Sequence, residues 1–310
     1  MTTVSHVLSS RRPVSEATRR KVLAVIDELD YRPNELARSM RAKRTNTIAL
    51  IVGDITNPFY TSAARGLQDT IKAADYHCIV TNTDADPAAT RDTIKQLLSR
   101  VDGIVISGGD HQDADIQPII DAGVPLVMLG ADVAGPGFDV VANDDFGSGA
   151  VAAQHLVDQG YRRVGFITAA PDSGTAARRM DGYRSVVGSV DPSLVIRSTG
   201  TLESGTRCMA SLLEMAEPPD AVLCISDVVA IGAMYAVLDR RLRIPDDVAV
   251  MGFDDIAAAA MVHPRLTTMA TASREHGEVA GQLLLARIDD PRTEPQRRLF
   301  PARLVRRDSA

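Results

Sequence analysis

After Thr45 the sequence alternates short, continuously apolar runs with longer stretches of helical spacing. An apolar run without polar alternation indicates a strand buried on both faces, as in a parallel sheet covered by helices on both sides. Regular alternation of such strands with helices predicts an α/β fold. The predicted strands are TIALIVGDI, HCIVTN, GIVISGG, PLVMLGAD, DVVAND, RVGFITAA, LVIRSTG, AVLCISD, VAVMGFDD and TTMATA.

Ten such strands in the roughly 260 residues after Thr45 are more than a single sheet usually contains, so two doubly wound parallel-sheet lobes are expected. Helices are expected between the strands, in stretches that include YTSAARGLQDTIKAADY, ATRDTIKQLLSR and GAVAAQHLVDQGY.

Polar side chains follow six of the predicted strands, at the edge where ligands bind in doubly wound folds. A cleft lined with carboxylate and amide acceptors suits a polyhydroxylated ligand. The alternative is that Asp and Asn serve there as turn and helix N-cap residues. The residues concerned are Asp54, Asn57, Asp110, Asp132, Asn143, Asp144, Asp227, Asp254 and Asp255.

The charge of the first 47 residues is opposite in sign to that of the rest. They carry ten Lys and Arg against five Asp and Glu, a net charge of +5, whereas the remaining 263 residues carry 24 against 35, a net charge of −11. A basic head on an acidic body favours contact between the head and a polyanion, although basic N-terminal segments are often only solvated.

Two helices are predicted in this basic segment. Ser15 is the expected N-cap of the first, which carries an apolar stripe of Val22, Ile26 and Leu29, and Pro33 bars its continuation. NELARSMRAKRTNT then predicts a short basic helix before the first strand.

Three cysteines, Cys78, Cys208 and Cys224, include no CxxC pair. Cys78 and Cys224 sit in apolar runs, which predicts buried free thiols in a reducing compartment. The N-terminus lacks the apolar stretch of a signal peptide, and the longest apolar runs stop near ten residues, short of a membrane span. We therefore predict a cytoplasmic protein without membrane contact.

Catalytic and cofactor signatures are weak. GSGAVA at 147–152 fits a dinucleotide-binding glycine pattern, but it follows the polar NDDF, and a helix N-terminus explains it better. GxSxG, HExxH and GxxxxGK[ST] motifs are absent, and the six histidines have no metal-binding spacing. The sequence predicts no enzyme, no cofactor and no metal site.

Several segments are specific when taken together in order. They are TVSHVLS, YRPNELARSMR, ITNPFY, RMDGYRSV, SDVVAIGAM, RIPDDVAVMGFDD and HPRLTTM. Across essentially the whole chain they resemble the blocks of the lactose/galactose-repressor (LacI–GalR) family of bacterial transcription regulators. The resemblance implies a small all-α helix-turn-helix head, a hinge helix and a two-lobed core like that of periplasmic sugar-binding proteins.

By this resemblance the DNA-binding head covers residues 1–32, and the hinge helix and linker cover 33–46. The effector-binding and dimerisation core covers 47–310, with one lobe at about 47–144 and 272–289 and the other at about 145–271 and 290–310.

The family has a first helix and a turn before the TVS motif, whereas only Met1 and Thr2 precede Thr3 here. We therefore expect a head that is incomplete as written, with a poorly ordered N-terminus and weak specific DNA binding. A start codon assigned too far downstream is the preferred explanation, and the upstream genomic sequence tests it.

The resemblance places Thr2, Thr3, Ser5 and His6 at the major groove of DNA. His6 stands where the family commonly has Arg. Because histidine cannot make the bidentate guanine contact of Arg, a different base preference is expected, and contact with phosphate alone is the alternative.

Met40 stands where the family has a leucine that wedges into the minor groove, and Met belongs to the same set of apolar wedges. Packing of Met40 against its own domain is the alternative. Asn34, Arg38 and Arg41 are expected to flank it and meet phosphates. Two wedges require two chains, so the resemblance implies a homodimer, possibly a tetramer, on operator DNA.

Arg179 in RRMDGY matches the family's effector arginine, whose planar guanidinium can fork onto adjacent hydroxyls or a carboxylate. The alternative is an arginine on the surface of the lobe. Asp254 is expected to accept from hydroxyls, and Asp227 to support the start of its helix. The predicted effector residues are Asn57, Phe59, Tyr60, Asp110, Asp132, Asn143, Arg179, Ser226, Asp227 and Asp254, with Phe59 or Tyr60 stacking on a sugar face.

Three departures from the family pattern speak against a simple hexose. Ser226 replaces a common Asn, RSTGTLESG lacks a stacking aromatic, and VANDD inverts the commoner Asp-Asn order. The sequence predicts a transcription regulator, a repressor, whose operator affinity is controlled by a small polar effector such as a sugar. The alternative is a cytoplasmic sugar-binding protein that has lost DNA binding.

Overall fold

The computed structural model describes residue 7 and residues 13–29, 44–107, 113–130, 132–133, 135, 137–169, 174–301 and 303–310. The chain divides into two compact units, Met1–Thr45 and Asn46–Ala310. Nine of the predicted site residues lie outside the described residues: Thr2, Thr3, Ser5, His6, Asn34, Arg38, Met40, Arg41 and Asp110.

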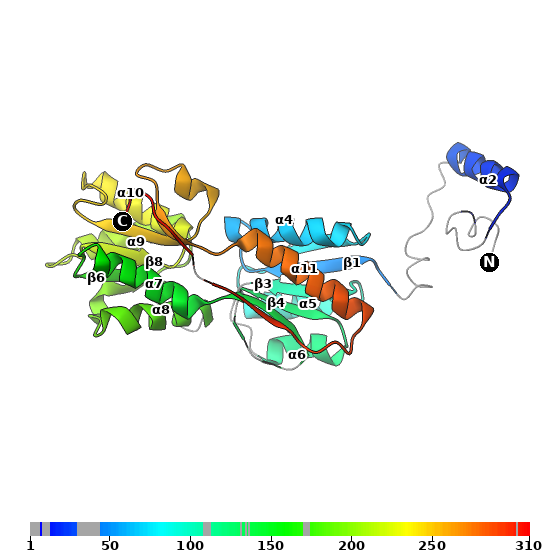
Figure 1. The fold of residues 1–310 in the computed structure, drawn as a ribbon, viewed down its shortest axis with the longest axis horizontal. Coiled ribbons are helices and arrows are strands. Elements are labelled where there is room, and N and C mark those ends of the chain that lie inside the picture. Colours follow the sequence, from blue (N-terminus) through cyan, green and yellow to red (C-terminus); the bar gives the residue numbers. More distant parts are fainter. Residues whose placement is uncertain are drawn as a thin grey trace. The chain divides into compact units, whose positions relative to one another are not determined.

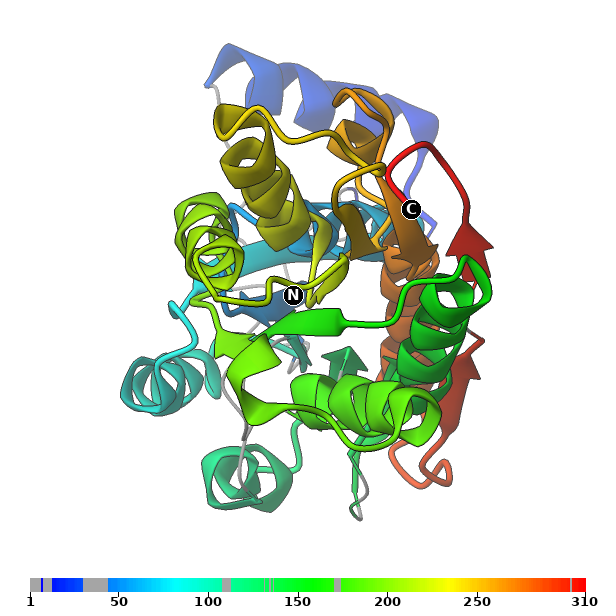
Figure 2. The same cartoon turned by 90° about the vertical axis from the view of Figure 1, so that its left-hand side faces the viewer.

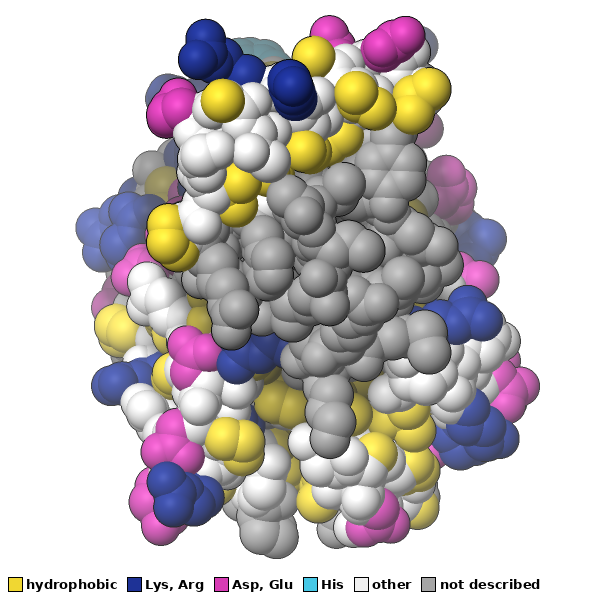
Figure 3. All heavy atoms as spheres, turned by 90° about the vertical axis from the view of Figure 1, so that its right-hand side faces the viewer, with side chains coloured by type: hydrophobic (Ala, Val, Ile, Leu, Met, Phe, Trp, Pro, Cys, Tyr) yellow, Lys and Arg dark blue, Asp and Glu magenta, His cyan; other side chains and the backbone are white. Residues whose placement is uncertain are grey.

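The first unit contains α2 (Glu16–Glu28), which begins at the predicted cap. Ser15 Oγ accepts a hydrogen bond from the Thr18 backbone N–H at 3.3 Å. Of the predicted apolar stripe, Val22 and Ile26 are half-buried, but Leu29 is 68% exposed. α2, which lies at the top of Figure 3, carries exposed apolar side chains beside Lys and Arg side chains.

The first lobe of the second unit contains a six-stranded parallel sheet (Figure 1). Two helices cover each face, because each helix has an apolar side that packs on the sheet. In sheet order the strands are β11 (Arg297–Phe300), β5 (Asp139–Asn143), β4 (Leu126–Gly130), β3 (Gly103–Ser107), β1 (Thr47–Val52) and β2 (His77–Asn82). One face carries α4 (Pro58–Lys72) and α11 (Ser273–Asp289), and the other α5 (Pro87–Leu97) and α6 (Asp113–Asp121).

The second lobe repeats this plan, with one helix pair on each face of its sheet (Figure 2). Its strands in sheet order are β12 (Arg303–Val305), β10 (Thr267–Ala270), β9 (Ala249–Asp254), β8 (Ala221–Cys224), β6 (Val164–Thr168) and β7 (Val195–Arg197). Its α-helices are the pairs α7 (Asp145–Asp158) with α8 (Gly174–Val187) and α9 (Leu202–Leu213) with α10 (Asp227–Asp239), and η1 (Pro192–Leu194) and η2 (Ala257–Ala260) are short 3-10 helices.

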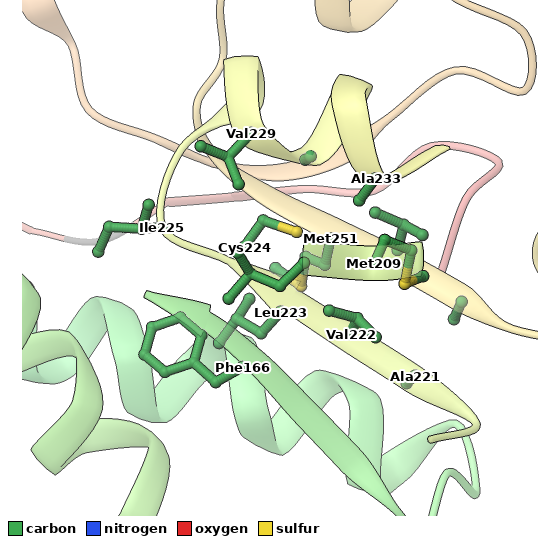
Figure 4. Close-up of a cluster of buried hydrophobic side chains, with 14 of the residues drawn as sticks. Phe166, Met209, Ala221, Val222, Leu223, Cys224, Ile225, Val229, Ala233 and Met251 are labelled. Atoms are coloured by element: carbon green, nitrogen blue, oxygen red, sulfur yellow. The ribbon is translucent and has the colours of Figure 1, made fainter. Parts of the chain in front are cut away.

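The core of the second lobe forms around β8, as Figure 4 shows for Phe166, Met209, Cys224 and Met251. Cys224 is fully buried as predicted, and Cys208 is also buried. Cys78 is only half-buried, because β2 is the edge strand of the first sheet, and burial raises the pKa of this thiol to about 11.

All ten predicted strands are present, but two further strands near the C-terminus were missed. β11 pairs with β5 of the first sheet, and β12 runs antiparallel to β10 of the second. The assignment of residues 290–310 to the second lobe is therefore wrong for β11. The chain crosses between the lobes three times, after β5, after β10 and after β11.

Paired helices touch through glycines. A side chain at Gly149 of α7 would overlap the Arg179 carbonyl of α8, and one at Gly182 of α8 would overlap the Phe146 carbonyl of α7. The glycine pattern in 147–152 therefore allows two helix backbones to approach closely, and it begins a helix as expected. Within the described part of the chain, no helix is both long and apolar enough to span a membrane.

Gly149→Ala should lower the stability of the second lobe by about 2 kcal/mol, because a well-packed contact must open to admit a methyl group. Chemical denaturation measures the change. Gly174→Ala is the matched control, since a side chain at Gly174 meets nothing within 4 Å, and it should leave stability unchanged within about 0.5 kcal/mol. Equal stabilities of the two variants would contradict this account of the α7–α8 contact.

Candidate functional site

Residues at the carboxyl ends of the two sheets lie close together. The Thr175 hydroxyl of α8 donates to the Gly130 carbonyl, the last residue of β4, at 3.4 Å. Tyr60 lies at the start of α4 in the first lobe. The charges of Asp254 and Arg179 in the second lobe both affect the pKa of its hydroxyl, so these residues lie near one another. We call Tyr60, Asp145, Arg179 and Asp254 the interlobe site.

Arg179 is buried and held from three sides. Its Nε donates to Asp145 Oδ1 at 2.9 Å, and its Nη1 donates to the Ile225 carbonyl at 2.6 Å. The guanidinium carbon lies 4.3 Å from the centroid of the Phe253 ring, a cation–π distance. These contacts fix the plane of the guanidinium, and Nη2 donates to no other described residue.

Asp145 was missed by the sequence analysis, which selected its neighbours Asn143 and Asp144. Burial raises the pKa of the Asp145 carboxyl, and the adjacent Arg179 guanidinium partly offsets that effect. No local pattern in the sequence marked Asp145, because its contact with Arg179 depends on the close approach of α7 and α8 at Gly149. Asp144 caps that helix, accepting from the Gly147 N–H at 2.9 Å.

Asp254 ends β9 in an unusual backbone conformation, with φ at +113°, which is costly for a residue with a side chain. Burial raises the pKa of its carboxyl to about 7, while Arg179 lowers it and Asp145 raises it further. Asp254 therefore lies at the interlobe site as a carboxyl that is half-protonated near neutral pH.

Tyr60 and Phe59 begin α4, with ring centroids 5.3 Å apart and ring planes at 85°. Burial raises the pKa of Tyr60 to about 12, and the nearby carboxylates Asp254 and Asp54 add to the shift. The neutral phenol thus presents an aromatic face and a hydroxyl beside the charged groups of the second lobe.

Two predicted acceptors have their carboxylates already engaged. Asp132 accepts from Arg297 at 2.6 Å and forms an ion pair with Arg178 of the second lobe at 3.2 Å. Asp227 is fully buried, and its oxygens accept from the Ile256 N–H at 2.9 Å and from the Thr268 hydroxyl. Burial, and then the nearby Asp254 carboxylate, raise the pKa of Asp227 well above its usual range. This geometry gives Asp132 a role in joining the lobes and Asp227 the fold-supporting role.

Other predicted positions act as helix caps. Asn57 accepts from the Phe59 N–H at 3.0 Å at the start of α4, and Ser226 accepts from the Val229 N–H at 3.4 Å at the start of α10. Asn143 is buried at the end of β5. The capping alternative, made for Asp and Asn at strand ends, therefore describes Asn57 and Asp144, and Ser226 is a cap as well. The interlobe site brings together Tyr60, Arg179 and Asp254 of the predicted set. No group of His, Cys, Asp and Glu side chains in the described ranges could hold a metal ion.

Comparison with known proteins identifies both parts of the chain. Residues 1–34 match the family described as bacterial regulatory proteins, lacI family, and residues 153–310 match the periplasmic binding protein-like domain. The ribose operon repressor of Escherichia coli strain K12 is 33% identical over 314 residues, which cover 99% of this chain and 95% of that protein. The chain belongs to the lacI family of bacterial regulatory proteins.

Other relatives in this family also align with this chain along most of their length. The HTH-type transcriptional repressor PurR of Photobacterium profundum is 30% identical over 306 residues, covering 96% of this chain and 91% of that protein. The transcriptional regulator CelR in complex with cellobiose is 30% identical with a TM-score of 0.79, covering 99% and 95% of the two chains. A LacI family regulator from Enterococcus faecium with bound ribose is 27% identical with a TM-score of 0.77, covering 85% and 98%.

These similarities identify this lacI-family member as a DNA-binding transcription regulator controlled by a small effector.

Loss of the guanidinium should destabilise the second lobe. Arg179→Leu leaves the Asp145 carboxyl buried without its cation, so the free energy of unfolding at pH 7 should fall by about 3 kcal/mol. Adding Asp145→Asn to this variant removes the unpaired charge and should restore part of the loss. Urea denaturation measures both effects.

The exposed pair of Arg65 and Asp69 provides the control, at an N–O distance of 3.0 Å. Arg65→Leu should change stability by less than about 1 kcal/mol, because solvent screens that pair. If Arg179→Leu also changed stability that little, the buried pair would not have the role described.

Proposed function

We propose that this regulator is a repressor whose operator affinity is set by a sugar-like effector bound at the interlobe site. The observation that carries the proposal is the buried, immobilised Arg179, whose Nη2 donates to no other described residue. A guanidinium fixed in plane binds adjacent hydroxyls with little loss of side-chain entropy.

The chemistry around Arg179 suits a small polyol. Asp254 supplies a carboxylate that accepts from hydroxyls, and Tyr60 and Phe59 supply apolar faces for a sugar ring. The relatives support this class, because they include ribose operon repressors and regulators with bound ribose or cellobiose. Ribose and cellobiose are the first ligands to test.

Control of DNA binding follows from contacts in both lobes. An effector that touches Tyr60 in the first lobe and Arg179 and Asp254 in the second stabilises the lobe arrangement in which those residues are close. The ion pair of Asp132 with Arg178 joins the same two lobes without a ligand. Effector and ion pair thus act on one equilibrium between lobe arrangements.

We further propose that two copies of the chain associate through the first lobe. β2 is an edge strand whose Ile79 and Val80 side chains are 42% and 37% exposed, and an unpaired apolar edge favours a protein partner. A second copy fits because a near-palindromic operator requires two heads. A groove beside this edge is lined by Val52, Ile55, Tyr60, Thr61, Ala64, Arg65, Gln68, Cys78 and Val80.

The proposed setting is the cytoplasm, where operator DNA is available, and the proposed action is binding without catalysis. Support comes from the relatives, which are transcriptional repressors.

A gel shift with DNA from the gene's own promoter region, made with the protein extended by any in-frame residues encoded upstream, tests the DNA-binding role. We expect a shift that weakens steeply as salt rises, because Lys and Arg displace counterions from phosphates. Met40→Ala should reduce DNA bending and affinity while effector binding is unchanged. No shift at low salt would favour the alternative, a sugar-binding protein without a DNA role.

Effector affinity should depend on pH through Asp254. Its pKa in the folded protein is about 7, above the usual 3.8, so the carboxyl is mostly protonated below pH 7, and in this neutral form it is a weaker acceptor for a ligand hydroxyl than the carboxylate. Affinity for ribose or cellobiose should therefore rise about tenfold from pH 6 to pH 8 and level off above. Calorimetric titration measures it, and Asp254→Asn should remove the pH dependence; a dependence that persists in this variant would assign it to another group.

A further inference from the structure

A buried histidine and a buried serine lie beside the aromatic residues that begin α4. We propose that His276 and Ser107 form a polar subsite of the effector site, on its first-lobe side. The subsite takes an uncharged hydroxyl or carbonyl group of the effector. This inference rests on the proposed effector role of the interlobe site.

Neither side chain has a hydrogen-bond partner among the described residues. His276 is 0% exposed, and neither Nδ1 nor Nε2 has a hydrogen-bond partner in the described part of the chain. Ser107 is 1% exposed, and its Oγ also lacks a partner there. Buried donors and acceptors are normally paired, and an apolar side chain would fill the same space without the cost of desolvation.

Both residues lie near Phe59. The His276 ring lies 6.3 Å from the Phe59 ring and 4.3 Å from the Phe300 ring, centroid to centroid. A Cβ atom at Gly130 would lie 3.8 Å from both the Phe59 ring and Ser107 Oγ, so Ser107 is also close to Phe59. The unpaired polar atoms therefore lie next to the aromatic residue that the sequence analysis predicted to stack on a sugar.

At the interlobe edge of the first lobe β3 ends, and α4 and α11 begin. Ser107 is the last residue of β3, Phe59 is the second residue of α4, and His276 is in the first turn of α11. α11 begins where the chain returns from the second lobe (Figure 1). In a doubly wound sheet this edge binds ligands.

The subsite is suited to an uncharged group. Burial lowers the pKa of His276 to about 4, so the ring is neutral and offers one donor and one acceptor. The Ser107 hydroxyl can also donate and accept. The charged groups of the site, Arg179 and Asp254, belong to the second lobe, so the two lobes recognise different parts of the effector.

The experiment compares the wild type with His276→Leu and Ser107→Ala. D-ribose, D-glucose and cellobiose are first screened by thermal shift, and the one that stabilises the wild type most is titrated calorimetrically into each protein. We expect at least about tenfold weaker binding in His276→Leu, with an unchanged or higher Tm without ligand, and a similar loss in Ser107→Ala.

The matched control is His155→Leu, another buried histidine, which lies in the last turn of α7 in the second lobe. Its sugar affinity should equal that of the wild type. A sugar analogue that lacks the hydroxyl contacted by His276 should bind the wild type more weakly than the parent sugar does. In His276→Leu, the analogue and the parent sugar should bind with equal affinity.

Unchanged affinity in His276→Leu and Ser107→Ala would overturn the subsite and leave the proposed function intact. Weaker binding together with a lower Tm in His276→Leu would show that the ring acts by packing, which also overturns it. If none of the three sugars stabilises the wild type, the proposed sugar effector fails, and this inference fails with it.

Discussion

The buried ion pair of Arg179 and Asp145 organises the second lobe at the interlobe site. A guanidinium cannot stay buried without a counter-charge and hydrogen-bond acceptors, and Asp145 and the Ile225 carbonyl supply them. The two partners come within reach because α7 and α8 touch through Gly149 and Gly182, with no side chain between the backbones. Burial raises the pKa of Asp254 and of Tyr60, and Arg179, held by this contact, partly offsets both shifts.

The first lobe contains a second buried pair with a different outcome. Arg287 of α11 makes two hydrogen bonds of 2.7 Å to Asp139 of β5, and a third to the Thr293 carbonyl. Asp139 also accepts from the Gln296 N–H. This pair is engaged on all sides and fixes the turn that leads into β11, whereas Nη2 of Arg179 donates to no other described residue and is available to the proposed effector. A buried Arg–Asp pair thus supports the fold in the first lobe, and in the second lobe it positions the guanidinium on which the proposed function rests.

Sequence patterns predicted secondary structure best where the strands are fully buried. The ten strands predicted from apolar runs all exist. Eight of them are buried along most of their length, because a strand covered on both faces must be apolar throughout, whereas the edge strands β2 and β7 are only partly buried. β11 and β12 were missed because they are short strands near the C-terminus whose side chains are half-buried or exposed, so RRLF and RLV carry no such run. β11 also joins a sheet formed more than 150 residues earlier in the chain, which no local pattern reveals.

By itself the sequence determined the two-lobed α/β architecture and the N-cap of α2, because these depend on local apolar periodicity and capping chemistry. It also predicted, from the family's motif, that Arg179 is an effector residue. Only the tertiary structure decided which polar residues remain available for a ligand. Asp132, Asp227, Asn57 and Ser226 looked alike at strand ends, but distant partners or neighbouring backbone amides occupy their oxygens. Asp145 and His276 stood out only through packing, because burial and the pairing of a side chain depend on residues far away in the sequence.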